Sequence, residues 1–311
     1  MGKHFNWFTS KVKEYCLVRF ETCTNNAQIS REIRKAFQLD HVDTEIIRKA
    51  ISAFRIKSGK REGNQIKRLF FDIETSPMIG WFWRTGKQYV DAKQIQVQKK
   101  IICISYKWQF EDSVRTLKWN NKQQDKEIVK EFIRILGEAD EIVAHNGDRF
   151  DIKEIRTRAI KEGVLMFPKY RTFDTLKKAR KYFNFNSNRL DYIGQVLEVG
   201  RKLDHEGIDL WLSVVDGDKE ALQRMIDYCE QDVILLEDVF HALSPYVDHN
   251  TNHSVHNNKG KAYCPNCASK DVKLSHTDTT PRGYIKRSMK CNTCKKQYDI
   301  SNKTYLAWLT K

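Results

Sequence analysis

An apolar run that ends in two acids, residues 68–75 (RLFFDIET), constrains this chain more than any other stretch. Its alternation predicts a β-strand, on which side chains two residues apart point to the same face. Asp72 and Glu74 then share one face, while Phe71 and Ile73 point to the other and can be buried. Neighbouring carboxylates repel each other unless a cation joins them, and Mg²⁺ takes oxygen ligands of this kind. The strand therefore predicts half of a metal site, with two solvated acids at a strand end as the alternative.

The formal net charge of +15 is confined to the two flanks of the 311-residue chain. Residues 1–67 hold 14 Lys and Arg against 7 Asp and Glu, residues 68–247 hold 29 against 29, and residues 248–311 hold 12 against 4. General solubility would not segregate charge in this way. Two basic flanks around a neutral middle favour a polyanionic partner, namely nucleic acid.

Neither a membrane span nor a signal peptide is apparent in the sequence, since no apolar run is long enough and the N-terminal residues lack an apolar core. These features predict a cytoplasmic protein with no membrane partner. Cysteines stay reduced in that compartment, so cysteines that cluster indicate a metal site before they indicate disulfides.

Two CxxC pairs separated by 23 residues predict a zinc ribbon over residues 262–311. Their spacing suits one tetrahedral structural Zn²⁺ ion. The four expected ligands are Cys264, Cys267, Cys291 and Cys294. Basic residues between the pairs predict a hairpin that faces nucleic acid, with docking to a protein as the alternative; they are Arg282, Lys286 and Arg287. The polar residues 248–261, which include three histidines, are expected to form a solvated linker.

Residues 1–58 predict a small helical module that resembles a helix-turn-helix. Apolar residues recur every four positions over residues 27–37, and a second helix is expected over residues 44–56. The second helix would enter a groove of nucleic acid, with any small helical pair as the alternative. Its side chains expected to face outward are Arg48, Lys49 and Arg55. Residues 59–67 are rich in charge and Gly and predict a linker.

The remaining residues, 68–247, alternate strand-like and helix-like segments and predict an α/β domain with a mixed sheet flanked by helices. Strands are expected at residues 68–75, 100–108, 113–119 and 141–145. Helices are expected at residues 125–137, 151–162, 172–182, 189–198 and 219–242.

Further acids on these elements are candidates for the rest of the metal site. In HNGDRFD, Asp151 can project from a helix start, whereas its rival Asp148 lies in the preceding turn; either residue could instead cap the helix. In the long last helix, Tyr228 and Asp232 lie four residues apart and share a face. A carboxylate there can bind a metal, and a phenol can orient a water.

Taken together and in order, FDIET, HNGDRFD and YCEQD resemble the three motifs of the DEDD superfamily of 3′-5′ exonucleases, tyrosine subtype. The resemblance implies a ribonuclease H-like fold over residues 68–247, with Asp72, Glu74, Asp151 and Asp232 as metal ligands. It also implies phosphodiester hydrolysis with two Mg²⁺ or Mn²⁺ ions roughly 3.5 to 4 Å apart. Asp72 would bridge the ions, and Tyr228 would align the attacking water.

The expected substrate is DNA. Trp81 and Trp83 follow the acids closely and would stack on the terminal bases of a single strand, with core packing as the alternative. Two other functions stay open: an RNA-processing exonuclease with the same site, and a nucleic-acid-binding regulator that uses the nuclease fold as a scaffold. The sequence names no replication or repair partner.

Overall fold

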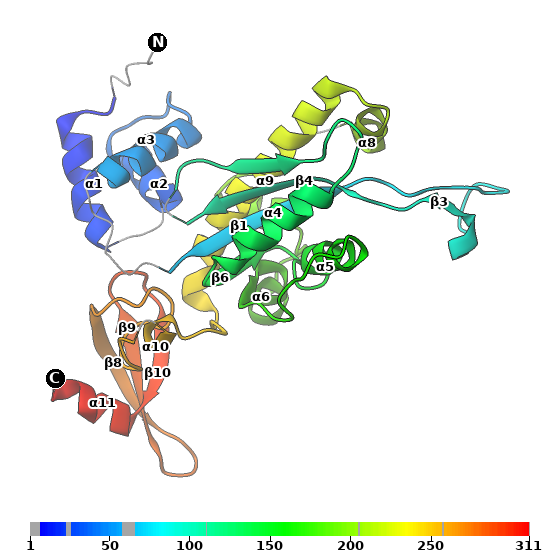
Figure 1. Ribbon diagram of the computed structural model, residues 1–311. Helices are drawn as coiled ribbons and strands as arrows, with labels where there is room; N and C mark the ends of the chain where they lie inside the picture. The colour runs from blue at the N-terminus through cyan, green and yellow to red at the C-terminus, as the bar shows by residue number, and fades with distance from the viewer. Residues whose placement is uncertain are drawn as a thin grey trace.

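The protein is represented by a computed structural model that describes residues 7–22, 26–57, 66–109, 111–204, 206–256 and 258–310. Within these ranges the description leaves out the side chains of residues 20–22, 26, 27, 45, 49, 52, 53, 55–57 and 256. The chain forms an N-terminal group of helices, a central α/β part and a C-terminal three-stranded sheet (Figure 1).

A five-stranded mixed sheet lies at the centre and confirms the predicted fold class. Its order is β5-β4-β1-β6-β7, so the acidic strand β1 occupies the middle. β1 runs antiparallel to β4 and parallel to β6. The strand bounds are β1 Arg68–Thr75, β4 Ile101–Trp108, β5 Arg115–Lys118, β6 Glu141–Ala144 and β7 Thr172–Asp174.

Helices cover both faces of this sheet. On one face α4 (Lys126–Gly137) and α5 (Asp151–Lys161) pack against Leu69, Phe71 and Ile73 of β1. On the other face α9 (Lys219–Leu243) packs against Phe70, whose ring centroid is 5.4 Å from that of Phe240. Smaller helices accompany α9: α6 Thr175–Tyr182, α7 Leu190–Val196 and α8 Ile208–Val215. Because Asp72 and Glu74 share the side of Phe70, both acids face α9.

One predicted helix and the segment after β1 differ from what the sequence predicted. The expected helix over residues 172–182 divides into β7 and α6, because Asp174 is extended and caps α6 by accepting hydrogen bonds from the Leu176 and Lys177 N–H groups. After β1 the chain forms an arm that the sequence did not predict. The arm contains β2 (Ile79–Gly80), the 3-10 helix η1 (Ala92–Gln94) and β3 (Ile95–Val97).

The N-terminal helices α1 (Ser10–Thr22), α2 (Asn26–Ala36) and α3 (Thr44–Lys57) share an apolar core of their own. α2 and α3 correspond to the two predicted helices, whereas α1 was not predicted. The prediction that the Arg48 side chain faces outward is wrong, because only 7% of this residue is exposed. Its charge is among those that lower the pKa of Glu237 on α9, so α3 turns Arg48 toward the central part of the chain. The side chains of Lys49 and Arg55 lie outside the described residues.

The C-terminal part is an antiparallel sheet of order β10-β9-β8, followed by a helix. Its bounds are β8 Val272–Thr279, β9 Ile285–Cys291, β10 Gln297–Ser301 and α11 Asn302–Leu309. The connection to the central part contains η2 (Ser244–Tyr246) and α10 (His253–His256). Residues 248–261 are not a solvated linker throughout, because His253 is fully buried with Nε2 3.2 Å from a Glu141 carboxylate oxygen.

Within the described ranges, no helix combines the length and the apolar character needed to cross a membrane.

Candidate metal centres

Three of the predicted acids converge where β1 meets α9. Asp72 and Glu74 come from β1 and Asp232 from α9, and one carboxylate oxygen of each lies within 4.8 Å of the other two. The strand alternation places both β1 acids on the side of α9, and the helix contributes Asp232 from a largely buried face. Tertiary packing therefore joins acids that are about 160 residues apart in the sequence.

Asp151, at the first position of α5, lies next to this cluster without being one of the three. Burial is the main cause of the raised pKa of Asp72, and the negative charge of Asp151 is the second. Its rival Asp148 points elsewhere, with Oδ2 2.8 Å from Lys177 Nζ. Of the two candidates in HNGDRFD, the structure brings Asp151 to the acids.

Burial and mutual repulsion make the ionised state of the cluster unfavourable when no cation is bound. Burial, followed by the charges of Asp151, Asp232 and Glu74, raises the pKa of Asp72 well above its usual range. Burial, then Asp232, raises the pKa of Glu74 to about 8. Burial raises the pKa of Asp151 to about 7. A divalent ion would reverse these shifts, because opposite charge favours the ionised carboxylate.

The donor set itself fits a cation. Asp232 is 2% exposed, and its Oδ1 is a buried atom with no hydrogen-bond partner among the described residues. A buried acceptor without a partner is costly and calls for an explanation such as an ion. Carboxylate oxygens are the ligands that Mg²⁺ and Mn²⁺ prefer.

Lys202 is a member of the site that sequence reasoning missed. Its Nζ lies 2.5 Å from Asp232 Oδ2 and donates a hydrogen bond to the Tyr228 hydroxyl at 2.9 Å. Burial, followed by the Asp232 charge, raises the pKa of Tyr228 to about 12. Lys202 lies in the connection between α7 and α8, outside the three motifs, and its spacing from Asp232 carries no helical or strand signal.

A hollow of about 880 Å³ opens beside Tyr228 and Lys202. The arginines in its lining were also missed in the sequence; they are Arg180, Arg189 and Arg201. His145 and Asn188 line it as well, and the Asn188 carbonyl oxygen lies 2.9 Å from His145 Nε2. A space of this size with several cations beside a carboxylate cluster suits a phosphate-bearing chain.

The turn before α5 is held by Asp174 and Gly147. One Asp174 carboxylate oxygen accepts from the Asn146 N–H at 3.0 Å and the other from the Asp148 N–H at 3.3 Å. A Cβ atom on Gly147 would lie 2.4 Å from the Ala144 Cβ, so only glycine fits there. These contacts fix the start of α5 and with it the position of Asp151.

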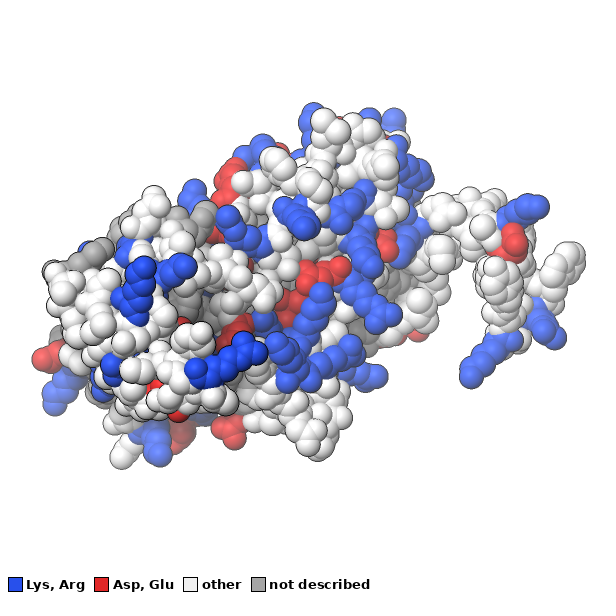
Figure 2. Space-filling model, turned by 90° about the horizontal axis from the view of Figure 1, so that it is seen from below, with Lys and Arg blue, Asp and Glu red and all other residues white. Residues whose placement is uncertain are grey.

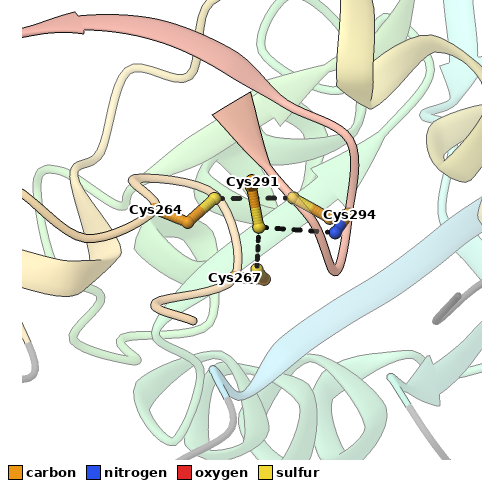
Figure 3. Close-up of side chains that lie close together, drawn as sticks. All are labelled: Cys264, Cys267, Cys291 and Cys294. Atoms are coloured by element: carbon orange, nitrogen blue, oxygen red, sulfur yellow. Dashed lines mark hydrogen bonds between the residues drawn. The ribbon is translucent and has the colours of Figure 1, made fainter. Parts of the chain in front are cut away.

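The four predicted zinc ligands also gather, as Figure 3 shows. Cys264 and Cys294 have their sulfur atoms 3.4 Å apart, and those of Cys267 and Cys291 are 3.7 Å apart. Sulfur atoms about 2.3 Å from a tetrahedral Zn²⁺ ion lie about 3.8 Å from one another. The cluster therefore fits a zinc ribbon.

The residues predicted to contact nucleic acid have different surroundings. Trp81 and Trp83 are 70% and 98% exposed, so core packing is excluded for both. Both lie between β2 and η1, on the arm, and neither belongs to the acid cluster. Arg282 is exposed. Lys286 and Arg287 make contacts inside the ribbon: Lys286 Nζ lies 2.6 Å from an Asp299 carboxylate oxygen, and Arg287 lies over the Tyr305 ring.

Comparison with known proteins adds three findings. Residues 69–244, more than half of the chain, match the family model of the RNase H superfamily. A DNA polymerase from Thermococcus litoralis is 32% identical over 114 residues, which cover 33% of this chain and 6% of that polymerase. The family B DNA polymerase of the archaeon Pyrobaculum calidifontis aligns with 60% of this chain and 26% of its own, at 17% identity and a TM-score of 0.46. The chain thus corresponds to a small part of the length of either polymerase.

Proposed function

Because the chain belongs to the RNase H superfamily, we propose that it is a metal-dependent nuclease and, more narrowly, a 3′-5′ exonuclease that acts on DNA. The observation that carries this proposal is the convergence of Asp72, Glu74 and Asp232 within 4.8 Å, with Asp151 beside them. The motif order supports the tyrosine subtype of the DEDD nucleases.

These four carboxylates would hold two Mg²⁺ or Mn²⁺ ions. When bound, such ions supply Lewis acidity and neutralise the charge that develops on the phosphate. The chain's own contribution is a rigid frame, since Asp72 and Glu74 are fixed in the middle strand and Asp232 in a long packed helix. A rigid frame holds the scissile phosphate and a water in line without loss of freedom at the moment of reaction.

Tyr228 and Lys202 would organise the attacking water. The raised pKa of Tyr228 keeps its phenol protonated at neutral pH, so the phenol can donate a hydrogen bond but is a poor nucleophile. Lys202 contacts both the Tyr228 hydroxyl and Asp232, and it would fix the distance between them. In this proposal Tyr228 orients the water and forms no covalent intermediate.

The strand would reach the site through the hollow beside Tyr228. Arg180, Arg189 and Arg201 would contact its phosphates. At the far end of the chain, the exposed Arg282 and Tyr284 of the ribbon would add a contact to nucleic acid. We further propose that residues 1–58, 68–247 and 262–311 are distinct domains, joined by residues 59–67 and 248–261.

DNA and RNA oligonucleotides labelled at the 5′ end test this function when incubated with Mg²⁺ or Mn²⁺. A ladder of shortening DNA products is expected, and Asp232→Ala should abolish it while the circular dichroism spectrum stays unchanged. A ladder on RNA alone would assign the site to RNA processing. One internal cut would indicate an endonuclease, and the absence of products with either ion would favour a binding regulator.

A further inference from the structure

The arm, residues 78–98, leaves the sheet directly after the acidic strand and projects away from the rest of the molecule (Figures 1 and 2). β2 and β3 pair in antiparallel fashion. The Trp81 N–H donates to the Gln94 carbonyl oxygen at 2.9 Å, and the Gln94 side chain donates back to the Trp81 carbonyl oxygen at 3.0 Å. The arm therefore has a hydrogen-bonded frame of its own.

Large aromatic side chains on this arm face solvent. Trp83 is 98% exposed, Tyr89 90% and Trp81 70%. Scattered apolar residues on a surface need no explanation, but a contiguous exposed patch marks an interaction site. Trp83 and Tyr89 line one hollow on the arm and so form such a patch, with Trp81 exposed nearby in the chain.

The charges of the arm indicate the class of its partner. Its three cations are Arg84, Lys87 and Lys93, and no ion pair within the described ranges involves any of them. Its one acid, Asp91, accepts a hydrogen bond from the Lys93 N–H at 2.8 Å and so caps η1. Aromatic rings interleaved with unpaired cations complement a polyanion that carries flat bases better than an apolar protein surface.

A hollow of about 570 Å³ on the arm has Trp83 and Tyr89 in its lining. Arg84 and Lys93 line the same hollow. Aromatic rings on which bases stack, beside cations that follow the phosphates, are the means by which proteins hold single strands. A duplex hides the faces of its bases, so this surface fits a single strand.

We propose that the arm is a second nucleic-acid site, which grips single-stranded DNA or RNA outside the catalytic cluster. It departs from β1 immediately after Asp72 and Glu74, so it would hold the part of the strand that lies beyond the nucleotides at the acids. The proposal rests on the proposed function only in that a polynucleotide is the substrate.

Binding to the full chain carrying Asp72→Asn, without Mg²⁺ or Mn²⁺, tests the arm separately from cleavage. The double substitution Trp83→Ala and Tyr89→Ala is introduced into this Asp72→Asn chain. The probes are fluorescent oligo(dT) and oligo(U) of about 30 nucleotides, and a blunt DNA duplex. Loss of two stacking rings should weaken single-strand binding by about 10-fold or more, and duplex binding should change little. Tyr246→Ala removes an aromatic ring that is 74% exposed outside the arm and serves as the matched control, with no effect expected.

Salt titration separates stacking from charge. Replacement of Arg84, Lys87 and Lys93 by Ala should lower the slope of log affinity against log salt by about 2, because each phosphate contact to a single strand contributes about 0.7. The double variant Trp83→Ala and Tyr89→Ala should have the same slope as the unsubstituted arm, because it removes no charge.

Unaltered single-strand affinity in the Trp83 and Tyr89 variant would overturn the proposal. An equal loss of affinity for the duplex would overturn it as well. A variant that binds nucleic acid normally but no longer self-associates would also overturn it and would identify the arm as a protein-docking element. A loss of affinity for oligo(dT) or for oligo(U) supports the proposed site on the arm and shows whether the arm holds DNA or RNA. If the unsubstituted chain cleaves nothing, the proposed function fails while this binding result stands.

Discussion

At the scale of single residues, the site depends on carboxylates that are poorly placed without a cation. Asp72, Glu74 and Asp232 share a small volume, and Asp232 Oδ1 has no hydrogen-bond partner in the described part of the chain. Repulsion of this kind lowers stability in the absence of metal and provides affinity in its presence. Contacts that disfavour folding, such as these neighbouring carboxylates, are expected at sites that bind a ligand.

The choice between Asp148 and Asp151 can be tested directly. Asp151→Asn should reduce cleavage by more than about 100-fold, beyond the roughly 10- to 100-fold effect of losing a residue that only supports a ligand. Asp148→Asn removes an exposed contact to Lys177 and serves as the matched control, with activity near that of the unsubstituted chain. Steady-state cleavage rates at saturating Mg²⁺ check both, and the reverse ranking would make Asp148 the ligand.

The raised pKa values predict a pH-dependent stability in the absence of Mg²⁺ and Mn²⁺. Glu74, with a pKa of about 8, and Asp151, with a pKa of about 7, keep their protons in the folded state. The unfolded chain loses the same protons near pH 4. The free energy of unfolding should therefore fall as pH rises from about 4 through about 8, since the folded state binds more protons over this range.

Thermal unfolding across this pH range measures the effect. Mg²⁺ should raise the midpoint more at pH 8 than at pH 5, because the ion binds ionised carboxylates. Glu74→Gln removes one of the carboxylates whose pKa is raised and should lessen the pH dependence obtained without Mg²⁺. A midpoint with the same pH dependence in Glu74→Gln would contradict the assignment.

At the scale of elements, β1 links the two candidate metal centres. Its first residue, Arg68, is 3% exposed and donates through Nη2 to the Asn266 carbonyl oxygen at 2.6 Å and to Asn266 Oδ1 at 2.9 Å. Asn266 lies between Cys264 and Cys267, and Arg68 Nε also donates to Glu141 at 2.6 Å. The first CxxC pair of the ribbon thus contacts the strand that carries Asp72 and Glu74.

Asn266→Ala should therefore affect β1, the strand that carries Asp72 and Glu74, from a distance. The change removes the hydrogen bonds that the Asn266 side chain makes to Arg68 and to Ser244 and should cost about 1 to 3 kcal/mol of stability. Amide hydrogen exchange in β1 should become faster. Asn292→Ala is the matched control, because Asn292 lies in the second CxxC pair and bonds Asp271 inside the ribbon. Equal exchange rates in the two variants would refute the link.

At the scale of the whole molecule, the two basic flanks lie at the end of the sheet where β1 begins, and the arm lies where β1 ends (Figure 1). Arg68, which contacts the ribbon, and Glu74 are separated by about 20 Å along the strand. A partner gripped only by the flanks would have to extend that far to reach the acids. Lys and Arg side chains spread over the face shown in Figure 2 offer intermediate contacts.

Arg48 joins the N-terminal helices to α9 and should act in stability. Burial opposes ionisation of Glu237, yet Lys107, His241 and Arg48 together lower the pKa of this acid to about 2. Arg48→Ala should cost about 1 to 3 kcal/mol in chemical unfolding and leave nucleic-acid affinity unchanged. The exposed Lys35→Ala, on α2, should stay within about 0.5 kcal/mol. A loss of affinity without a loss of stability would restore Arg48 as a nucleic-acid contact.

Local patterns were sufficient for most elements of this protein and for most members of its acid and cysteine clusters. The alternation in β1, the spacing of Tyr228 and Asp232 on one helix and the two CxxC pairs depend on residues near one another in the sequence. Strand and helix geometry convert that spacing directly into a shared face or a shared ion. The central sheet and the cysteine cluster follow these predictions.

Contacts between distant segments were decided only by tertiary structure. Lys202 reaches Asp232 across 30 residues, and Arg68 meets Asn266 across 198. Arg48 is buried, with its charge close enough to Glu237 of α9 to lower the pKa of that acid. The sequence left core packing open for Trp81 and Trp83, and only the structure shows that both side chains are exposed on the arm. Periodicity reports which face of an element a side chain occupies, whereas the neighbour of that face depends on how the elements pack.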